Sequence, residues 1–148
     1  MHVLSQPLFA PRPLAGRTVG QLTVAGCSMV AAVIHAWVVP EHYEEYWLFG
    51  LFFAVIAFVQ GVWAAAVVRR PTRLVQSAGA ALSIGVLALW ALSRTAGVPV
   101  GPEPWHAEPT ELLDVLAGVA ELAIIVVLTT SLGRRPVSPS PSRAASRD

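Results

Sequence analysis

The apolar residues of this chain fall into four long blocks separated by short polar segments. The blocks cover about residues 19–39, 46–68, 74–93 and 112–132. Each block has about 20 residues, the length that an α-helix needs to cross about 30 Å of hydrocarbon. The pattern therefore predicts an all-α membrane protein, built as a bundle of four transmembrane helices.

The two ends of the chain differ from these blocks. Residues 1–18 contain proline and arginine without a hydrophobic period, and residues 133–148 are rich in proline, serine and arginine. Segments of this composition cannot bury enough apolar surface to offset the entropy lost on folding. We therefore expect two disordered tails on either side of a bundle formed by residues 19–132.

Composition supports the membrane class. The chain is 55% hydrophobic and only 13% charged, whereas soluble domains carry about 25% charged residues. Its single cysteine, Cys27, excludes an intrachain disulfide and makes a cysteine-based zinc site unexpected. Residues 24–27 match the letters of a lipoprotein cleavage box, but no apolar signal segment precedes them, so neither lipidation nor cleavage is expected.

The arginines predict the orientation of the bundle in the membrane. All ten basic residues are arginine, and all except Arg94 lie before the first block, between the second and third, or after the fourth. By the positive-inside rule these segments face the cytoplasm, so we expect both termini there. The arginines are ordinary topology signals, so the expected partner is the lipid bilayer, and nucleic acid is not expected.

Polar residues inside the blocks are expected to face protein or water, because an ionisable group in hydrocarbon costs about 2.5–3.5 kcal/mol on insertion scales. Gln21, Ser28 and His35 repeat every seven residues, a spacing that places them along one side of a helix. We predict a polar seam between the helices whose members are Gln21, Ser28, Gln60 and Ser83.

The fourth block carries three acids on one helix face, Glu111, Asp114 and Glu121. Glu121 lies near the middle of the bilayer, where a carboxyl group must be paired, bind a cation, or be protonated. One interpretation is a protonated Glu121 that is hydrogen-bonded to Gln60, Ser83 or a backbone carbonyl. Arg94, at the end of the third block, is predicted to form an ion pair with Asp114.

Histidines and carboxylates concentrate toward one end of the predicted bundle. Residues 40–44 and 102–108 both begin Pro-Glu and both contain an aromatic residue beside His-x-Glu, which hints at a duplicated hairpin. Imidazole with carboxylate suits zinc, iron, manganese or copper(II), so a divalent transition metal is the cofactor class this set would take. No established metal motif occurs. The candidate ligands are His35, His42, Glu45, Glu111, Asp114 and Glu121.

The sequence leaves two principal functions open, and a third, a small transporter or channel, would require oligomerisation because four spans are few for one. The first is an integral plasma-membrane protein whose outward-facing His/carboxylate cluster binds a divalent metal or relays protons. The second is a non-enzymatic accessory or assembly subunit of a larger membrane complex, with other membrane-protein subunits or further copies of itself as partners. An enzyme is less expected, because the chain shows no nucleophile–base pair, phosphate loop or cofactor fingerprint.

Several of these residues occur in an arrangement that resembles uncharacterised small four-span membrane proteins of actinobacteria. The resemblance covers roughly residues 20–130 and lies in His35, Pro40-Glu41-His42, Glu45, Gly50-Leu51-Phe52-Phe53, Gln60, Ser93-Arg94-Thr95-Ala96-Gly97-Val98-Pro99, Glu111, Asp114 and Glu121. It implies a bacterial plasma-membrane location. It implies no activity and transfers no catalytic residue.

Overall fold

The computed structural model describes residues 18–133, and four helices account for most of them. They are α1 (Val19–Glu45), α2 (Trp47–Arg69), α3 (Arg73–Thr95) and α4 (Leu112–Gly133). All four are long and apolar enough to cross a membrane, and the described residues contain no strand. The predicted all-α, four-helix membrane fold is confirmed. Of the segments predicted to be disordered, residues 1–17 and 134–148 lie outside the described residues, whereas Thr18 caps α1 and Gly133 is the last residue of α4.

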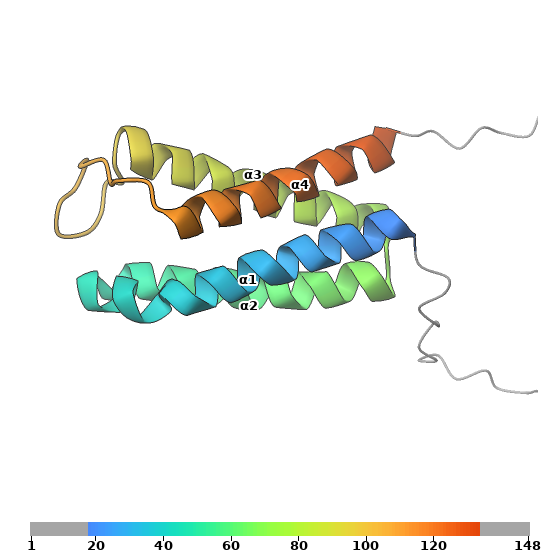
Figure 1. The fold of residues 1–148 in the computed structure, drawn as a ribbon, viewed down its shortest axis with the longest axis horizontal. Coiled ribbons are helices and arrows are strands. Elements are labelled where there is room, and N and C mark those ends of the chain that lie inside the picture. Colours follow the sequence, from blue (N-terminus) through green and yellow to red (C-terminus); the bar gives the residue numbers. More distant parts are fainter. Residues whose placement is uncertain (1–17, 134–148) are drawn as a thin grey trace, which may run out of the picture.

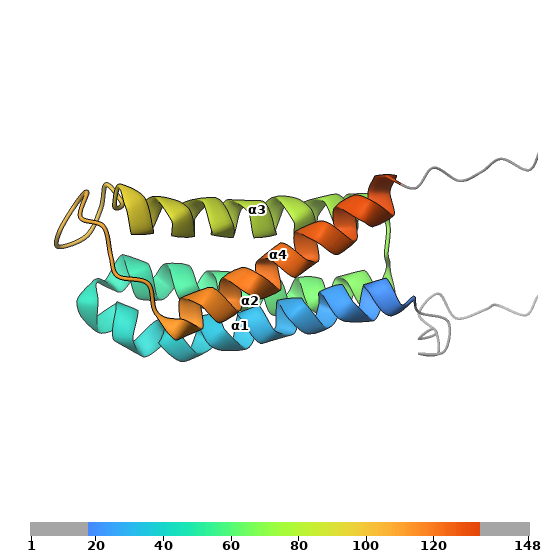
Figure 2. The ribbon, with the colours of Figure 1, turned by 45° about the horizontal axis from the view of Figure 1, so that its top comes forward.

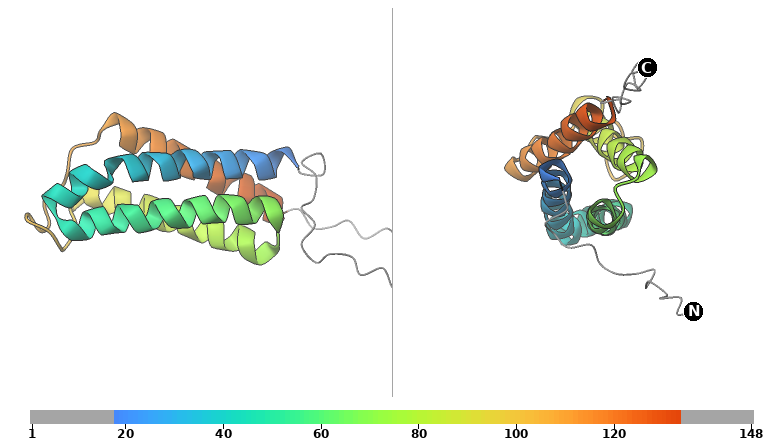
Figure 3. Two further views of the ribbon diagram at one scale, coloured as in Figure 1. Left: turned by 90° about the horizontal axis from the view of Figure 1, so that it is seen from below. Right: turned by 90° about the vertical axis from the view of Figure 1, so that its right-hand side faces the viewer.

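The helices form two hairpins, α1–α2 and α3–α4, that lie side by side (Figure 1). Around the bundle, α1 contacts α2 and α4, and α3 contacts α4 and α2, an order that the end-on view in Figure 3 shows. α4 runs obliquely across the other helices (Figure 2). The α2–α3 pair shares the fewest contacts, so the seam between these two helices is the loosest in the bundle.

The two ends of the bundle differ. The α1–α2 turn and the connection formed by residues 96–111 lie together at one end, which we call the loop end (Figure 1). The short α2–α3 connection lies at the opposite end, together with the start of α1 and the end of α4. Arg69, Arg70 and Arg73 lie there, and we call it the arginine end.

α1 continues six residues past the predicted end of the first span, from residue 39 to Glu45. The sequence predicted a loop from Pro40 onward, but Pro40 lies inside the helix. Proline removes one backbone hydrogen bond, yet close packing on α2 supports the helix here. At Gly50, any Cβ would lie 2.7 Å from the Cα of Tyr43. The turn between the helices is therefore the single extended residue Tyr46.

A capping box fixes the start of α1. The hydroxyl of Thr18 accepts from the backbone N–H of Gln21 at 3.3 Å, and the side chain of Gln21 accepts from the backbone N–H of Thr18 at 3.1 Å. The spacing Thr18-x-x-Gln21 is the sequence signature of this motif. Gln21 therefore caps a helix and does not belong to the polar seam in which the sequence analysis placed it.

Trp63 joins α2 to α3 near the arginine end. Its indole N–H donates to the backbone carbonyl of Val75 at 2.8 Å. The ring lies directly against Gly79, where any Cβ would overlap it. Trp63 also belongs to the apolar core, together with Val67 and Ile124. This contact closes the α2–α3 seam at the arginine end.

Candidate functional site

Four buried polar side chains meet around Gln60 in the middle of the bundle. The hydroxyl of Ser28 donates to the backbone carbonyl of Gln60 at 2.9 Å. Nδ1 of His35 lies 2.9 Å from Oε1 of Gln60, and Nε2 of Gln60 donates to Oε1 of Glu121. No member is more than 6% exposed. One glutamine thus connects α1, α2 and α4 through buried hydrogen bonds.

The Gln60 amide couples the protonation of Glu121 to the tautomer of His35. With Oε1 of Gln60 toward His35, Nδ1 of the imidazole carries a proton and donates. The amide N–H then donates to Glu121, whose carboxyl oxygen accepts. Turning the amide over exchanges these roles, because a protonated Glu121 would donate to Oε1 and the amide would donate to Nδ1. The network therefore accommodates either protonation state of Glu121.

Glu121 has hydrogen-bonding capacity that this network does not use. Its side chain is fully buried, at 0% exposure. Among the residues the structure describes, its Oε2 is a buried atom without a hydrogen-bond partner. Buried polar atoms are nearly always hydrogen-bonded, and a buried charge without a partner costs several kcal/mol. Glu121 is therefore the polar group of this core with the strongest requirement for a further partner.

A cavity of about 280 Å³ lies between the two hairpins, and side chains from all four helices line it. Among its polar lining residues, His35 and Glu121 lie nearest the middle of their helices, and we call this part of the cavity the deep end. The walls are apolar, with Phe49, Phe52 and Phe53 contributed by α2. Small-molecule sites are typically concave and apolar, contain a few placed polar groups, and measure about 300–1,000 Å³. The cavity matches this description at the small end of the range.

The α3–α4 connection covers the cavity at the loop end. Gly97 has a φ of +76°, and a Cβ there would lie 2.5 Å from the backbone of His106. At Gly101, a Cβ would lie 2.6 Å from Cζ of Phe49, so the connection rests directly on α2. Between these two close contacts, residues 98–100 line the cavity. The connection is thus a fitted cover for the loop end of the cavity.

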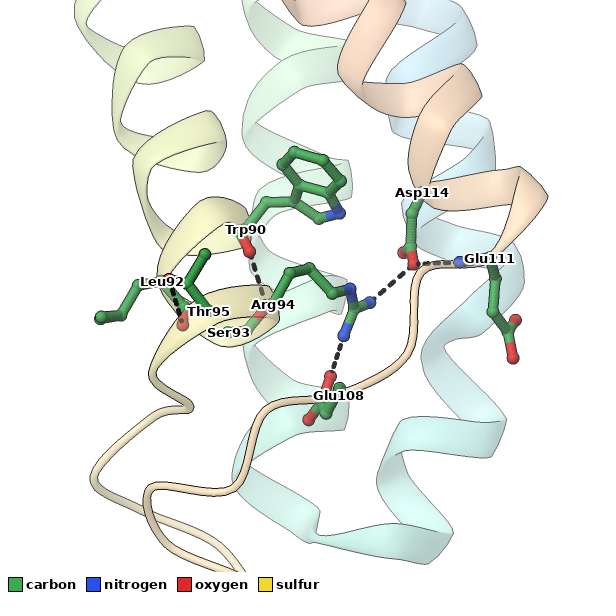
Figure 4. Close-up of polar contacts among 8 residues, drawn as sticks. All are labelled: Trp90, Leu92, Ser93, Arg94, Thr95, Glu108, Glu111 and Asp114. Atoms are coloured by element: carbon green, nitrogen blue, oxygen red, sulfur yellow. Dashed lines mark hydrogen bonds and ion pairs between the residues drawn. The ribbon is translucent and has the colours of Figure 1, made fainter.

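Arg94 binds two carboxylates at the rim of the cavity (Figure 4). Its Nη2 donates to Oδ2 of Asp114 at 2.7 Å, the partner that the sequence indicated, and its Nη1 donates to Glu108. The same Oδ2 of Asp114 accepts from the backbone N–H of Glu111 at 2.9 Å and so caps the start of α4. Arg94 therefore joins α3, α4 and the cover.

Two N–H groups on α3 have spare hydrogen-bonding capacity toward the same cavity. Within residues 18–133, Nε1 of Trp90 and Nε of Arg94 are buried atoms without a partner. Trp90, Arg94 and Glu121 all line the cavity, and Figure 4 shows the first two projecting from α3 toward Asp114. Among the described residues, those that line the cavity thus include two with an unpartnered N–H near the loop end and one with an unpartnered carboxyl oxygen toward the middle of the bundle.

The candidate metal ligands are distributed over separate environments and do not form one site. His42 contacts the carbonyl of Val38 at 2.9 Å, and Glu45 and Glu111 are exposed. In the part of the chain that the structure describes, no three His, Cys, Asp or Glu side chains gather closely enough to hold a metal ion. A shared metal cluster is therefore not supported by the fold. The predicted set was His35, His42, Glu45, Glu111, Asp114 and Glu121.

Residues 40–44 and 102–108 are alike in sequence but differ in structure. The first segment belongs to α1, whereas the second lies in the irregular α3–α4 connection. Trp90 and Glu108 also contribute to the site, although neither was among the predicted site residues. Trp90 had a usable signal, because it precedes Arg94 by four residues and so shares its helix face. Glu108 had none, because a loop residue has no periodicity from which its partner follows.

No family model, curated protein or solved structure matches this chain. Its class therefore follows from the fold and the site alone. Four apolar helices of membrane-spanning length define a multi-pass integral membrane protein. A largely apolar cavity with a buried carboxyl group is its main candidate for a functional site.

Proposed function

We propose that this protein binds a small, largely apolar molecule in the cavity between its two hairpins. The observation that carries the proposal is Glu121, a fully buried acid that lines the cavity with a carboxyl oxygen lacking a partner within residues 18–133. The apolar walls favour such a ligand by about 25 cal/mol for each Å² of apolar surface removed from water. The polar groups would fix its orientation.

We propose further that the protein lies in a bacterial plasma membrane with both termini in the cytoplasm. The support is the positive-inside rule, because Arg69, Arg70 and Arg73 gather at the arginine end. The cavity would then belong to the outer half of the membrane, under a cover on the outside. The likeness to small four-span proteins of actinobacteria agrees with this location.

Ligand binding is better supported than metal binding or a proton relay, the two functions that the sequence suggested for the histidines and acids. For metal binding, residues 18–133 contain no cluster of three potential ligands that could hold the ion. For a proton relay, the hydrogen bonds that connect His35 to Glu121 run through Gln60, whose amide is neither an acid nor a base at ordinary pH. A role as an accessory subunit stays a prediction, since none of the contacts within the chain bears on it.

Filling the cavity tests the proposed function. Gly118 of α4 lines the cavity, and a leucine there would occupy part of it, because even a Cβ would reach Leu87 at 3.7 Å. We expect solvent extracts of the purified protein to contain a stoichiometric small molecule that Gly118→Leu loses. Mass spectrometry of the extracts measures it.

The matched control is Gly85→Leu, at an exposed position of α3 with no atom within 4 Å of its Cβ. This variant should retain the molecule. Equal amounts in both variants, or none in the unmodified protein, would contradict ligand binding.

A further inference from the structure

We infer that the ligand is a para-quinol, an aromatic ring with one hydroxyl group at each of two opposite ends. This inference rests on the proposed binding function and names the chemical class that the same cavity would take. It follows from the kinds of polar group at the two ends of the cavity, from the distance between them, and from the walls.

The loop end of the cavity requires a neutral oxygen. Trp90 and Arg94 each have an N–H without a partner among the described residues, so this end calls for a hydrogen-bond acceptor. Arg94 is already bound by the carboxylates of Asp114 and Glu108. Its charge is therefore neutralised, and a second anion beside these acids would be repelled. A hydroxyl or carbonyl oxygen fits these donors better than a carboxylate or phosphate.

The deep end requires a hydrogen-bond donor when Glu121 is ionised. Gln60 occupies Oε1 of this carboxyl group, which leaves Oε2 to accept from a ligand. Nδ1 of the nearby His35 is engaged by Gln60, so only its Nε2 remains for a ligand. A hydroxyl can accept at the loop end and can also donate at the deep end, so the same neutral group suits both ends of the cavity. A quinol carries one such group at each end.

The separation of the two ends fits one aromatic ring. Asp114, which binds Arg94, precedes Glu121 by seven residues, so the two lie about 10 Å apart along α4. A ring with oxygens at opposite ends, extended by a hydrogen bond of about 2.8 Å on each side, spans a similar length. The α2 wall presents Phe52 and Phe53, whose centroids are 5.4 Å apart, and such rings pack well against a flat aromatic ligand.

The open seam indicates that the ligand comes from the lipid. α2 and α3 share the fewest contacts of any neighbouring pair, and the contact of Trp63 with Gly79 lies toward the arginine end. Leu89 of α3 lines the cavity and is 36% exposed. An apolar tail on the ring would pass between α2 and α3 into the bilayer while the ring stayed in the cavity.

A ligand series tests the inference. The purified full-length protein in lipid nanodiscs is titrated without oxygen with 2-methyl-1,4-naphthohydroquinone, 1-naphthol and 2-methylnaphthalene, which carry two, one and no hydroxyl groups. Isothermal calorimetry measures the affinities. We expect the dihydroxy compound to bind about tenfold more tightly than 1-naphthol, because one additional hydrogen bond contributes about that much. The hydrocarbon should bind most weakly.

Substitutions at Glu121 and Trp90 test the hydrogen bond that the ligand would form at each end of the cavity. Glu121→Gln and Trp90→Phe should each weaken the dihydroxy compound about tenfold and leave 2-methylnaphthalene unchanged. The controls Glu111→Gln and Trp37→Phe change the same chemical groups at exposed positions outside the cavity and should have no effect. Unchanged affinity of the dihydroxy compound in both Glu121→Gln and Trp90→Phe would overturn the inference, provided that size-exclusion chromatography and helix content match the unmodified protein.

The outcomes separate the two proposals. Equal affinity for all three compounds would overturn the quinol inference and leave a cavity that binds apolar molecules. No binding of any compound, together with no effect of Gly118→Leu on extracted material, would overturn the proposed function as well. A quinol with a polyisoprenyl tail should bind more tightly than the tailless ring, and equal affinity would overturn entry of the ligand from the lipid.

Discussion

At the scale of single residues, Gln60 organises the polar core. Its side chain meets His35 and Glu121, and its backbone carbonyl accepts from Ser28. All four groups are buried between helices that otherwise pack through apolar side chains. Because an amide both donates and accepts, a single residue satisfies an imidazole and a carboxyl group at once. The core therefore depends on this residue more than on either ionisable partner.

Replacement of Gln60 tests this dependence. Gln60→Leu keeps a similar volume but leaves His35 and Glu121 without their buried partner, so we expect a loss of about 2–3 kcal/mol in unfolding free energy. Ser28→Ala removes only one hydrogen bond to the Gln60 backbone and should cost about 1 kcal/mol. Unfolding by SDS in mixed micelles measures both changes. Equal stability of the two variants would contradict a central role for the Gln60 side chain.

At the scale of the elements, glycines determine how closely two pairs of helices approach. Gly50 lets the end of α1 lie on α2, and Gly79 lets α3 lie on the ring of Trp63. Small residues at such positions are typical of membrane helices, which associate through close packing and not through the hydrophobic effect. Gly61 and Gly85 occupy similar helices but have no atom within 4 Å of a Cβ. A glycine alone therefore does not identify a helix contact.

Substitution by alanine, which adds a single methyl group, should affect these two kinds of glycine differently. In Gly79→Ala the new Cβ would overlap the Trp63 ring, so α3 must shift, and we expect a loss of about 1–3 kcal/mol in stability. Gly85→Ala adds the same methyl group to the same helix in open space. It should be neutral or stabilising by up to about 1 kcal/mol, since alanine favours the helix. Thermal unfolding in detergent measures both, and equal loss would contradict the packing argument.

At the scale of the whole molecule, two hairpins meet tightly at one end and enclose a cavity at the other. Trp63 and Gly79 close the arginine end. Toward the loop end the hairpins surround the cavity, and residues 98–100 of the α3–α4 connection cover it. Arg94 links this cover to α3 and α4 through Glu108 and Asp114. The architecture thus gives a membrane-embedded cavity a covered loop end and a loosely packed side.

Orientation is a prediction at the same scale, and cysteine labelling tests it. In a Cys27→Ser background, we place one cysteine in the α3–α4 connection, Glu103→Cys, or in the C-terminal tail, Ser140→Cys. A membrane-impermeant maleimide added to intact spheroplasts should label the first variant and not the second, because the positive-inside rule predicts that the arginine-containing tail faces the cytoplasm. Lysis should expose both. Labelling of Ser140→Cys before lysis would contradict the proposed orientation.

The sequence by itself determined that this is a four-helix membrane protein, because the length and hydrophobicity of a span are local properties of the chain. The capping box of Thr18 and Gln21 was equally local. The continuation of α1 past Pro40 does not follow from local sequence, because a contact between α1 and Gly50 of α2 outweighs the local effect of the proline.

The tertiary structure decided which of the possible contacts between polar residues form. Gln60 and Glu121 are 61 residues apart, and their contact depends on how three helices pack. Helical spacing assigned His35, Asp114 and Glu121 to plausible faces, but it suggested one shared metal cluster. The fold engages His35 and Glu121 with Gln60, engages Asp114 with Arg94, and encloses a cavity between them. A cavity is a property of the space between helices, and no periodicity along a single helix encodes it.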